Sequence, residues 1–354
     1  MLRRPAFAVV VLTATASLLA GCGSSSSGGG SGSSPSSNNS SLSPQAELTS
    51  AVQALADSAT LTTSLKIGAS GSSLLAFVKA QDPSAKLTAA QAAEIAGLSF
   101  NFEVSAPSGK TLATMSGLSN EGAANISIAE GSKSLVSIRF VNKTLYLQAD
   151  LKDVLNQLGQ AATYRQMSAA AGQLPGFLGA LVSGKWVSLP LATLKQFTGS
   201  LGAAVPSSPD AAKSHQLITA LEGLLTKDVT VTRTSSGDTD QLTLTANLRT
   251  LAGDFTSTFA SIVPGAGSAL GSADVSKAPN KNITLTASVT NGALSALTLD
   301  LGQLAKSGKG NLPIMLAFSQ SGAAIGAPSG AVPVDLSSLG SLLGAFGGGS
   351  GLGG

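Results

Sequence analysis

The chain has 354 residues, of which 21 are Lys or Arg and 18 are Asp or Glu, so its formal net charge is +3. Charged residues make up 11% of the chain, less than half of the roughly 25% of an average soluble protein. Two of the basic residues, Arg3 and Arg4, lie in a segment that we expect to be removed, and without them 19 basic residues face 18 acidic ones. This balance gives no support for nucleic-acid binding. Uncharged small residues must cover most of the surface, which suits an extracytoplasmic protein better than a cytosolic enzyme.

The first 22 residues carry the pattern of a bacterial lipoprotein signal. Arg3 and Arg4 precede an apolar run from about residue 6 to 18, and positions 19–22 read Leu-Ala-Gly-Cys, with the single cysteine of the chain at the end. We expect residues 1–21 to be a signal peptide, cleaved between Gly21 and Cys22. The Cys22 thiol is then expected to carry a diacylglyceryl group with acyl chains such as palmitate. The alternative of an uncleaved anchor is disfavoured because a spanning helix needs ~20 residues.

Low-complexity segments flank one long central region. Residues 22–43 begin with Cys22 and continue almost entirely in Ser, Gly and Asn, which cannot bury enough apolar surface to fold. We predict that they form a flexible tether, and that the Gly-rich residues 347–354 are disordered. Residues 44–346 are predicted to form a single domain. We expect the chain to be anchored by lipid at the extracytoplasmic face of the cell membrane, within the cell envelope, and to have no nucleic-acid partner.

Apolar residues alternate with polar ones in several segments of the central region, which predicts strands with one apolar face. The pattern occurs at 98–104, 136–140, 242–246, 283–289 and 314–318. The opposite face carries Thr, Ser and Asn, so the sheet should be antiparallel or mostly so. Turn signals at Asn142-Lys143, at residues 235–238 and at Asn291-Gly292 predict hairpins. The sequence therefore predicts an α+β fold built on one long, curved, antiparallel meander.

A repeated motif predicts where short helices begin. Asp150, Asn247, Asp300 and Asp335 are each followed by Leu and by another apolar residue three positions further on, and Pro190 begins a variant of the same motif. Asp and Asn are good N-caps because their side chains accept a hydrogen bond from a free backbone N–H. These helices should begin where strands end and fold back over the sheet. Further helices are predicted at 47–56, 72–80, 88–95, 168–181 and 210–225.

The order of these segments resembles the LolA-like superfamily, in particular the LppX/LprG type of actinobacterial lipid-carrier lipoproteins. The resemblance rests on the lipobox and tether, on the strand at 143–150 that leads to a helix, and on Gly-Lys-Trp-Val-Ser-Leu-Pro at 184–190. It also rests on Ile-Gly-Ala-Pro at 325–328 and on Val-Asp-Leu at 334–336. It implies a twisted half-barrel whose concave apolar face is partly roofed by helices, with a cavity for acyl chains. The segment at 200–227 exceeds the compact members of that family.

The apolar faces of the predicted strands give the candidate ligand site, although the same alternation also fits a filled core. Trp186 and Tyr146 are interpreted either as the mouth of a pocket or as packed side chains. The candidate cavity-lining residues are Phe100, Phe102, Ile138, Phe140, Trp186, Leu242, Leu244, Leu285, Leu316 and Phe318. The leading hypothesis is a non-catalytic lipoprotein that binds or transfers an apolar lipid or lipoglycan. The alternative is a structural lipoprotein with a filled core that contacts another envelope protein.

Enzymatic readings find little support in the sequence. The single histidine, His215, lies on the polar side of the helix predicted at 210–225, and a lone helical histidine is more often a surface residue than a catalytic base. The chain has no G-x-S-x-G or S-x-x-K motif. The acidic residues at the predicted helix starts are explained by capping. We therefore expect no catalytic residues, no metal site and no cofactor.

Overall fold

The computed structural model describes residues 42–115, 122–174, 176–193, 227, 229–254, 279–305 and 311–335. The main α-helices in these ranges are α2 (Pro44–Ala56), α3 (Gly71–Gln81), α4 (Ala89–Gly97), α5 (Leu151–Gln157), α6 (Ala161–Ala170) and α7 (Gly176–Val182). The 3₁₀ helices are η1 (Leu112–Thr114), η2 (Ala171–Gln173) and η4 (Leu301–Leu304). The first six strands are β1 (Thr60–Ile67), β2 (Leu98–Ser105), β3 (Ala123–Glu130), β4 (Lys133–Val141), β5 (Thr144–Ala149) and β6 (Val187–Pro190). The others are β7 (Val229–Ser236), β8 (Thr239–Asn247), β9 (Asn282–Thr290), β10 (Ala293–Asp300), β11 (Pro313–Ser319) and β12 (Val332–Pro333).

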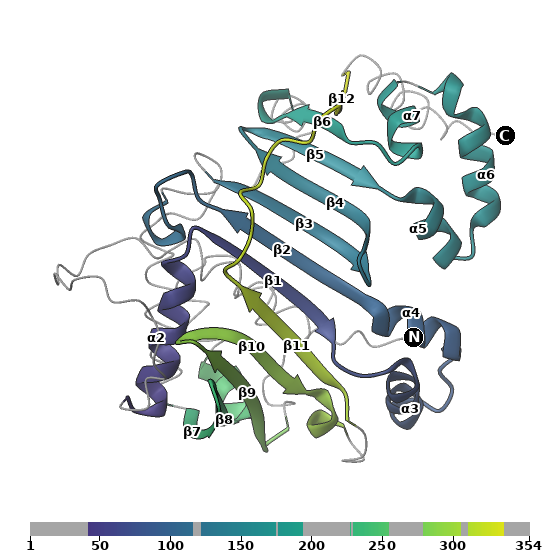
Figure 1. The fold of residues 1–354 in the computed structure, drawn as a ribbon. Coiled ribbons are helices and arrows are strands. Elements are labelled where there is room, and N and C mark those ends of the chain that lie inside the picture. The colour runs from purple at the N-terminus through teal and green to yellow at the C-terminus, as the bar shows by residue number, and fades with distance from the viewer. Residues whose placement is uncertain are drawn as a thin grey trace.

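The described strands form one twelve-stranded sheet in the order β12-β6-β5-β4-β3-β2-β1-β11-β10-β9-β8-β7. Every pairing is antiparallel except that of β12 with β6, which is parallel. The sheet is open, since β12 and β7 at its two ends are not joined. Figure 1 shows β7–β9 turned away from the plane of β2–β5, so the sheet is strongly twisted. The predicted α+β class with one mostly antiparallel sheet is confirmed.

Polar caps fix most of the helix starts that the sequence predicts. Ser43 caps α2, Thr88 forms a capping box at α4, and Asp150 caps α5 by accepting a hydrogen bond from the N–H of Asp153 at 3.1 Å. Asn247 accepts from two N–H groups of the helix at 248–254, and Asp300 caps a 3₁₀ turn instead of an α-helix. These predictions are confirmed, with Asp300 corrected to the tighter helix type. The motif at Asp335 runs beyond the described residues.

One predicted helix is wrong. Residues 168–181 were expected to form a single helix, but α6 ends at Ala170 and α7 begins at Gly176. Leu174 separates them in extended conformation, with ψ at 153°. Its next residue in the sequence is Pro175, and steric contact with a proline ring disfavours the helical conformation of the preceding residue.

The hairpin turns follow the predicted dipeptides. Asn142 and Lys143 have φ values of 50° and 58° between β4 and β5, and Asn291 and Gly292 have 52° and 74° between β9 and β10. Positive φ at both central residues is the geometry of a two-residue type I′ turn. Gly237, with φ at 60°, lies in the turn between β7 and β8. These turns fix the registers that bring the apolar residues of neighbouring strands to one face.

Residues 320–331, here named the C-terminal strap, run from the end of β11 across the sheet to β12. The hydroxyl of Thr60 on β1 donates to the carbonyl of Gln320, and the N–H of Ile325 donates to the hydroxyl of Ser105 on β2. Further along, Arg139 on β4 donates to the carbonyl of Gly326 at 2.9 Å. Figure 1 shows this segment in yellow as it crosses in front of β1–β5. The strap therefore ties the C-terminal part of the chain to strands formed much earlier in the sequence.

Candidate functional site

The strand registers place the predicted apolar residues on one face of the sheet. In one row, Ile138 on β4 pairs with Ile126 on β3, which pairs with Phe102 on β2, and Phe102 pairs with Thr63 on β1. A second row begins two residues along β1 and runs through Leu65, Leu316, Leu297, Ala287 and Leu242. Residues two apart in a strand point to the same face. The strands around Ile138 and around Leu242 therefore share one apolar face, although they lie in different halves of the sheet.

The half of this face formed by β7–β10 is filled. Helix α2 packs against it with Leu48, Ala51 and Leu55, and the strands contribute Leu242 and Leu244, which are 0% and 6% exposed. Phe102, Leu285, Phe318 and other partly buried residues surround this cluster. A side chain with no exposed surface lies in a packed core. Leu242 and Leu244 are thus core residues of the folded chain and line no open space.

The half of the apolar face formed by β2–β4 is left open. Ile128 on β3 is 40% exposed and Ile138 on β4 is 37% exposed, whereas Asn125 and Ser127, on the opposite face of β3, are 7% and 8% exposed. This reverses the usual arrangement, in which the apolar residues of a strand are the buried ones. We use the term open patch for the apolar side chains that the strand registers bring together here. They are Phe100, Ile126, Ile128, Val136 and Ile138.

The polar face of the same strands is covered at one end by the C-terminal strap. Arg139 lies on this face, and its guanidinium stacks 5.0 Å from the centre of the Trp186 ring. Such a contact contributes about 0.5–1 kcal/mol at a partly exposed site. The carbonyl of Trp186 in turn accepts from the N–H of Val332 in β12. Trp186 therefore holds the end of the strap and lies on the face opposite to the open patch.

The remaining predicted lining residues are partly buried on the apolar face. Phe100 belongs to the open patch, Phe140 lies further along β4, and Leu316 lies on β11 between the open and filled halves. Tyr146 pairs with Arg139 and so shares the polar face with Trp186. The structure thus brings most of the predicted residues together in two groups, one around the open patch and one in the core under α2, whereas Trp186 lies on the opposite face of the sheet.

A buried ionic cluster lies beneath the first turn of α2, and the sequence offered no signal for it. Glu47 on α2 and Asp240 on β8 are each 2% exposed, and Arg233 Nε on β7 lies 2.8 Å from Glu47 Oε2. Arg233 also donates to the carbonyl of Leu42, just before the helix. Burial, a hydrogen bond with Asp240 and the charge of Asp240 raise the pKa of Glu47, while Arg233 opposes them. This cluster joins the start of the domain to the far edge of the sheet.

Some predicted features lie outside the described residues. They are Gly21 and Cys22 of the lipobox, His215 and the helix predicted at 210–225, and the Gly-rich tail at 347–354. Within the ranges that the structure does describe, no helix is long and apolar enough to cross a bilayer. In those ranges, no three His, Cys, Asp or Glu side chains gather in a way that could hold a metal ion.

No protein-family model matches the chain, and no curated protein matches its sequence. Among solved structures, the chain is similar to the lipoprotein LppX of Mycobacterium tuberculosis, with 10% identity over 80% of this chain and 98% of LppX and a TM-score of 0.30. It is also similar to LprF of Mycobacterium bovis, with 11% identity over 81% of this chain and 97% of LprF and a TM-score of 0.31.

Proposed function

We propose that this chain is a lipid-anchored envelope lipoprotein that holds the acyl part of an apolar lipid on the open patch, without catalysing a reaction. The observation that carries the proposal is the exposure of the apolar side chains of Ile128 and Ile138, whereas polar residues on the opposite face of the same strands are buried. Burying each methylene of an acyl chain there contributes about 0.8 kcal/mol, from which the cost of ordering the chain is subtracted. The lipobox at Cys22 supports the same proposal, because an anchored protein meets acyl chains at the membrane surface.

Photo-crosslinking of the anchored chain tests this proposal. The full chain is reconstituted in phospholipid vesicles with a diazirine-bearing palmitate, irradiated and digested, and the labelled peptides are identified by mass spectrometry. We expect saturable labelling of peptides from β3 and β4 that unlabelled palmitate competes away. Ile138→Ser should reduce that labelling, since it removes apolar contact at the patch. Val52→Ser is the matched control, because Val52 is 37% exposed on α2, outside the patch. Labelling spread evenly over the exposed surface, or unchanged in Ile138→Ser, would contradict the proposal.

A second candidate function is supported by the filled half of the sheet. The packing of α2 against Leu242 and Leu244 leaves a solid core there, as expected of a structural or protein-interaction lipoprotein that has no ligand. In that case the open patch would contact an apolar surface of another envelope protein. Two results distinguish these functions. If the chain is an interaction lipoprotein, the diazirine-bearing palmitate should give no saturable labelling at the patch. A cysteine-specific crosslinker attached to the Ile138→Cys variant should instead link this variant to another envelope protein in intact envelopes.

A further inference from the structure

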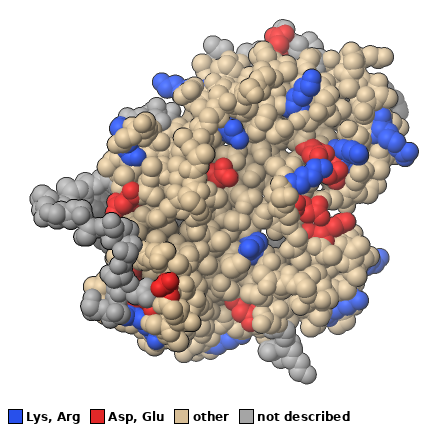
Figure 2. Space-filling model, viewed as in Figure 1, with Lys and Arg blue, Asp and Glu red and all other residues tan. Residues whose placement is uncertain are grey.

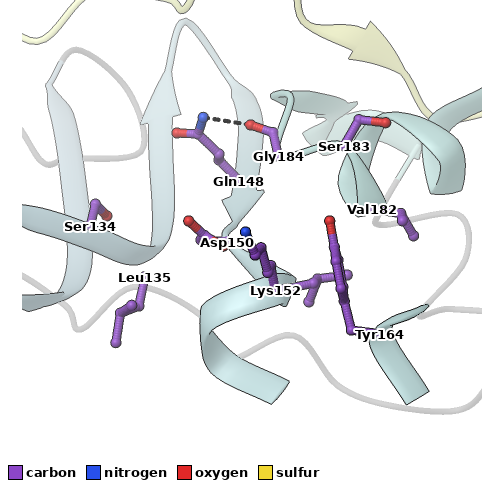
Figure 3. A pocket seen from close by; sticks show the side chains of 10 residues that line it. Ser134, Leu135, Gln148, Asp150, Lys152, Tyr164, Val182, Ser183 and Gly184 are labelled. Atoms are coloured by element: carbon purple, nitrogen blue, oxygen red, sulfur yellow. Dashed lines mark hydrogen bonds between the residues drawn. The ribbon is translucent and has the colours of Figure 1, made fainter. Parts of the chain in front are cut away.

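A polar cavity lies where the chain leaves β5 and passes through α5, α6 and α7. Its volume is about 250 Å³, which is below the ~300–1,000 Å³ of pockets for drug-sized ligands, so it accommodates one small group. Figure 3 shows its walls, which come from the start of β4, the end of β5 and three helices. They are formed by Ser134, Leu135, Gln148, Asp150, Leu151, Lys152, Tyr164, Val182, Ser183 and Gly184. None of these residues belongs to the open patch.

Two of the polar side chains in this cavity are held in place by the fold. Gln148 donates through Nε2 to the carbonyl of Gly184 at 2.8 Å, which fixes its amide and leaves the amide oxygen as an acceptor. Asp150 caps α5, and its carboxylate lies 2.8 Å from the ammonium group of Lys133. Lys133 is the main cause of a lowered pKa for Asp150, which is therefore ionised at neutral pH. The cavity thus presents fixed acceptor oxygens on one wall.

Two further donors in the lining form no hydrogen bond or ion pair with the residues that the structure describes. No hydrogen bond or ion pair engages the ammonium group of Lys152 or the hydroxyl group of Tyr164. Figure 3 shows that both side chains extend toward the turn that carries Ser183 and Gly184. Tyr164 also contributes the face of its ring, which can pack against C–H groups of a ligand. Hydrogen-bond donors, hydrogen-bond acceptors and one aromatic ring therefore line the same small cavity.

The charges around the cavity favour a neutral ligand. Lys133 and Lys152 are balanced by Asp150 and Asp153, and Lys133 also forms an ion pair with Asp153. Figure 2 shows acidic and basic side chains gathered together at the edge of the molecule where α5 lies in Figure 1. A phosphate or carboxylate in this cavity would lie close to the ionised Asp150 as well as to the lysines, and the two negative charges would repel each other. A hydroxyl group, by contrast, can donate to Asp150 or Gln148 and accept from Lys152 or Tyr164.

We propose that this cavity is a binding site for a single uncharged sugar ring, such as one unit of a neutral glycan. The ring would lie against Tyr164, with its hydroxyl groups between the acceptors of Gln148 and Asp150 and the donors of Lys152 and Tyr164. The assignment does not rest on the lipid-binding proposal, because the two sites share no residue.

Ligand-observed saturation-transfer NMR on the full chain tests the site. The protein is kept in a zwitterionic detergent without a sugar headgroup and titrated with the methyl glycosides of glucose, mannose, galactose and arabinose, and with inorganic phosphate. We expect at least one glycoside to bind saturably with a dissociation constant of about a millimolar, and more tightly than phosphate. Losing one hydrogen bond in Lys152→Met or in Tyr164→Phe should weaken this binding roughly three- to tenfold. Lys185→Met and Tyr146→Phe are matched controls outside the cavity and should bind within about twofold of the wild type.

Three results would overturn the assignment. They are the absence of saturable binding by every glycoside, tighter binding of phosphate than of any glycoside, and unchanged binding in both cavity variants. Lys152 is exposed, so Lys152→Met keeps the test decisive even where thermal unfolding shows that Tyr164→Phe has lost its fold. The palmitate labelling of the open patch should be the same in Lys152→Met as in the wild type, so failure of one proposal is distinguishable from failure of the other.

Discussion

Large apolar side chains on one face of this sheet have opposite environments. Leu244 on β8 is 6% exposed under α2, whereas Ile138 on β4 is 37% exposed. Both point to the same face, so the difference comes from what covers the strand and not from the strand itself. Substituting a larger side chain at each position tests whether other elements are packed over that part of the strand.

We predict that the same substitution has different effects at these two positions. Leu244→Trp overpacks the core under α2 and should lower the free energy of unfolding by about 1–3 kcal/mol. Ile138→Trp extends into open space and should change it by no more than ~0.5 kcal/mol. Urea unfolding followed by circular dichroism measures both. A loss in Ile138→Trp as large as that in Leu244→Trp would show that the patch is packed and not open.

The buried Glu47 makes a prediction about pH. Its pKa is raised above the value of about 4.3 in an unfolded chain, so the folded state binds this proton more tightly. The stabilising contribution of protonated Glu47 is therefore complete below the unfolded pKa and is lost as pH rises through the folded pKa. We expect Glu47→Gln to match the wild type in acid and to become the more stable protein as pH rises toward neutral. Thermal unfolding across this pH range measures the difference.

Glu94→Gln on α4 is the control for the loss of one acidic side chain. It should show no such divergence from the wild type, because Glu94 lies outside the buried cluster. A Glu47→Gln variant whose stability falls relative to the wild type with rising pH would mean that the ion pair with Arg233 outweighs burial and the charge of Asp240.

At the scale of elements, we predict that alanine substitutions of two glycines change the stability in opposite directions, one in the β9–β10 turn and one in η2. Gly292 has a φ of 74°, which an L-residue adopts at a cost of roughly 1–2 kcal/mol, so Gly292→Ala should destabilise by about that amount. Gly172 in η2 has no positive φ and equally open surroundings, so Gly172→Ala should stabilise by about 0.4–1 kcal/mol. Thermal unfolding of the two variants provides the comparison. Equal losses in both would mean that steric contact and not backbone conformation decides the outcome at Gly292.

Elements with strong local signals could be predicted from the sequence, and those without them could not. The cap at Asp150 and the turn at Asn291-Gly292 both follow from a few adjacent residues. Strands β1, β3, β7 and β10 have weaker signals, because Thr, Ser, Ala or, in β7, Arg233 interrupts the apolar alternation there. The sequence leaves open whether Leu242 and Leu244 belong to a core or line a cavity, because the helix that covers them, α2, lies some 190 residues earlier in the chain. Alternation shows which face is apolar, whereas its cover comes from remote segments such as α2.

At the scale of the whole molecule, we predict that the lipobox at residues 19–22 anchors the protein to the membrane. Cys22→Ser removes the only thiol that can form the thioether, so we expect the precursor to remain unlipidated and either uncleaved or released in soluble form. Membrane fractionation and intact mass spectrometry measure the result. A serine variant that is still processed at residue 22 and still carries a diacylglyceryl mass would refute the lipoprotein signal. We predict that the folded domain is unchanged, because the Ser-, Gly- and Asn-rich segment at 22–43 is expected to bury little apolar surface.

The pairing of β1 with β11 has a consequence for how the protein is made. Thr62 on β1 pairs with Ser319 on β11, so the centre of the sheet joins residues from opposite ends of the domain. During synthesis, β1 can pair with β2 early, but its other edge stays open until β11 has emerged. Contacts so distant in sequence form slowly, and an open strand edge is a site for pairing with other chains. The sheet is therefore most prone to pairing with other chains late in biogenesis. At that stage nearly the whole chain has been synthesised, but the sheet still consists of two separate halves.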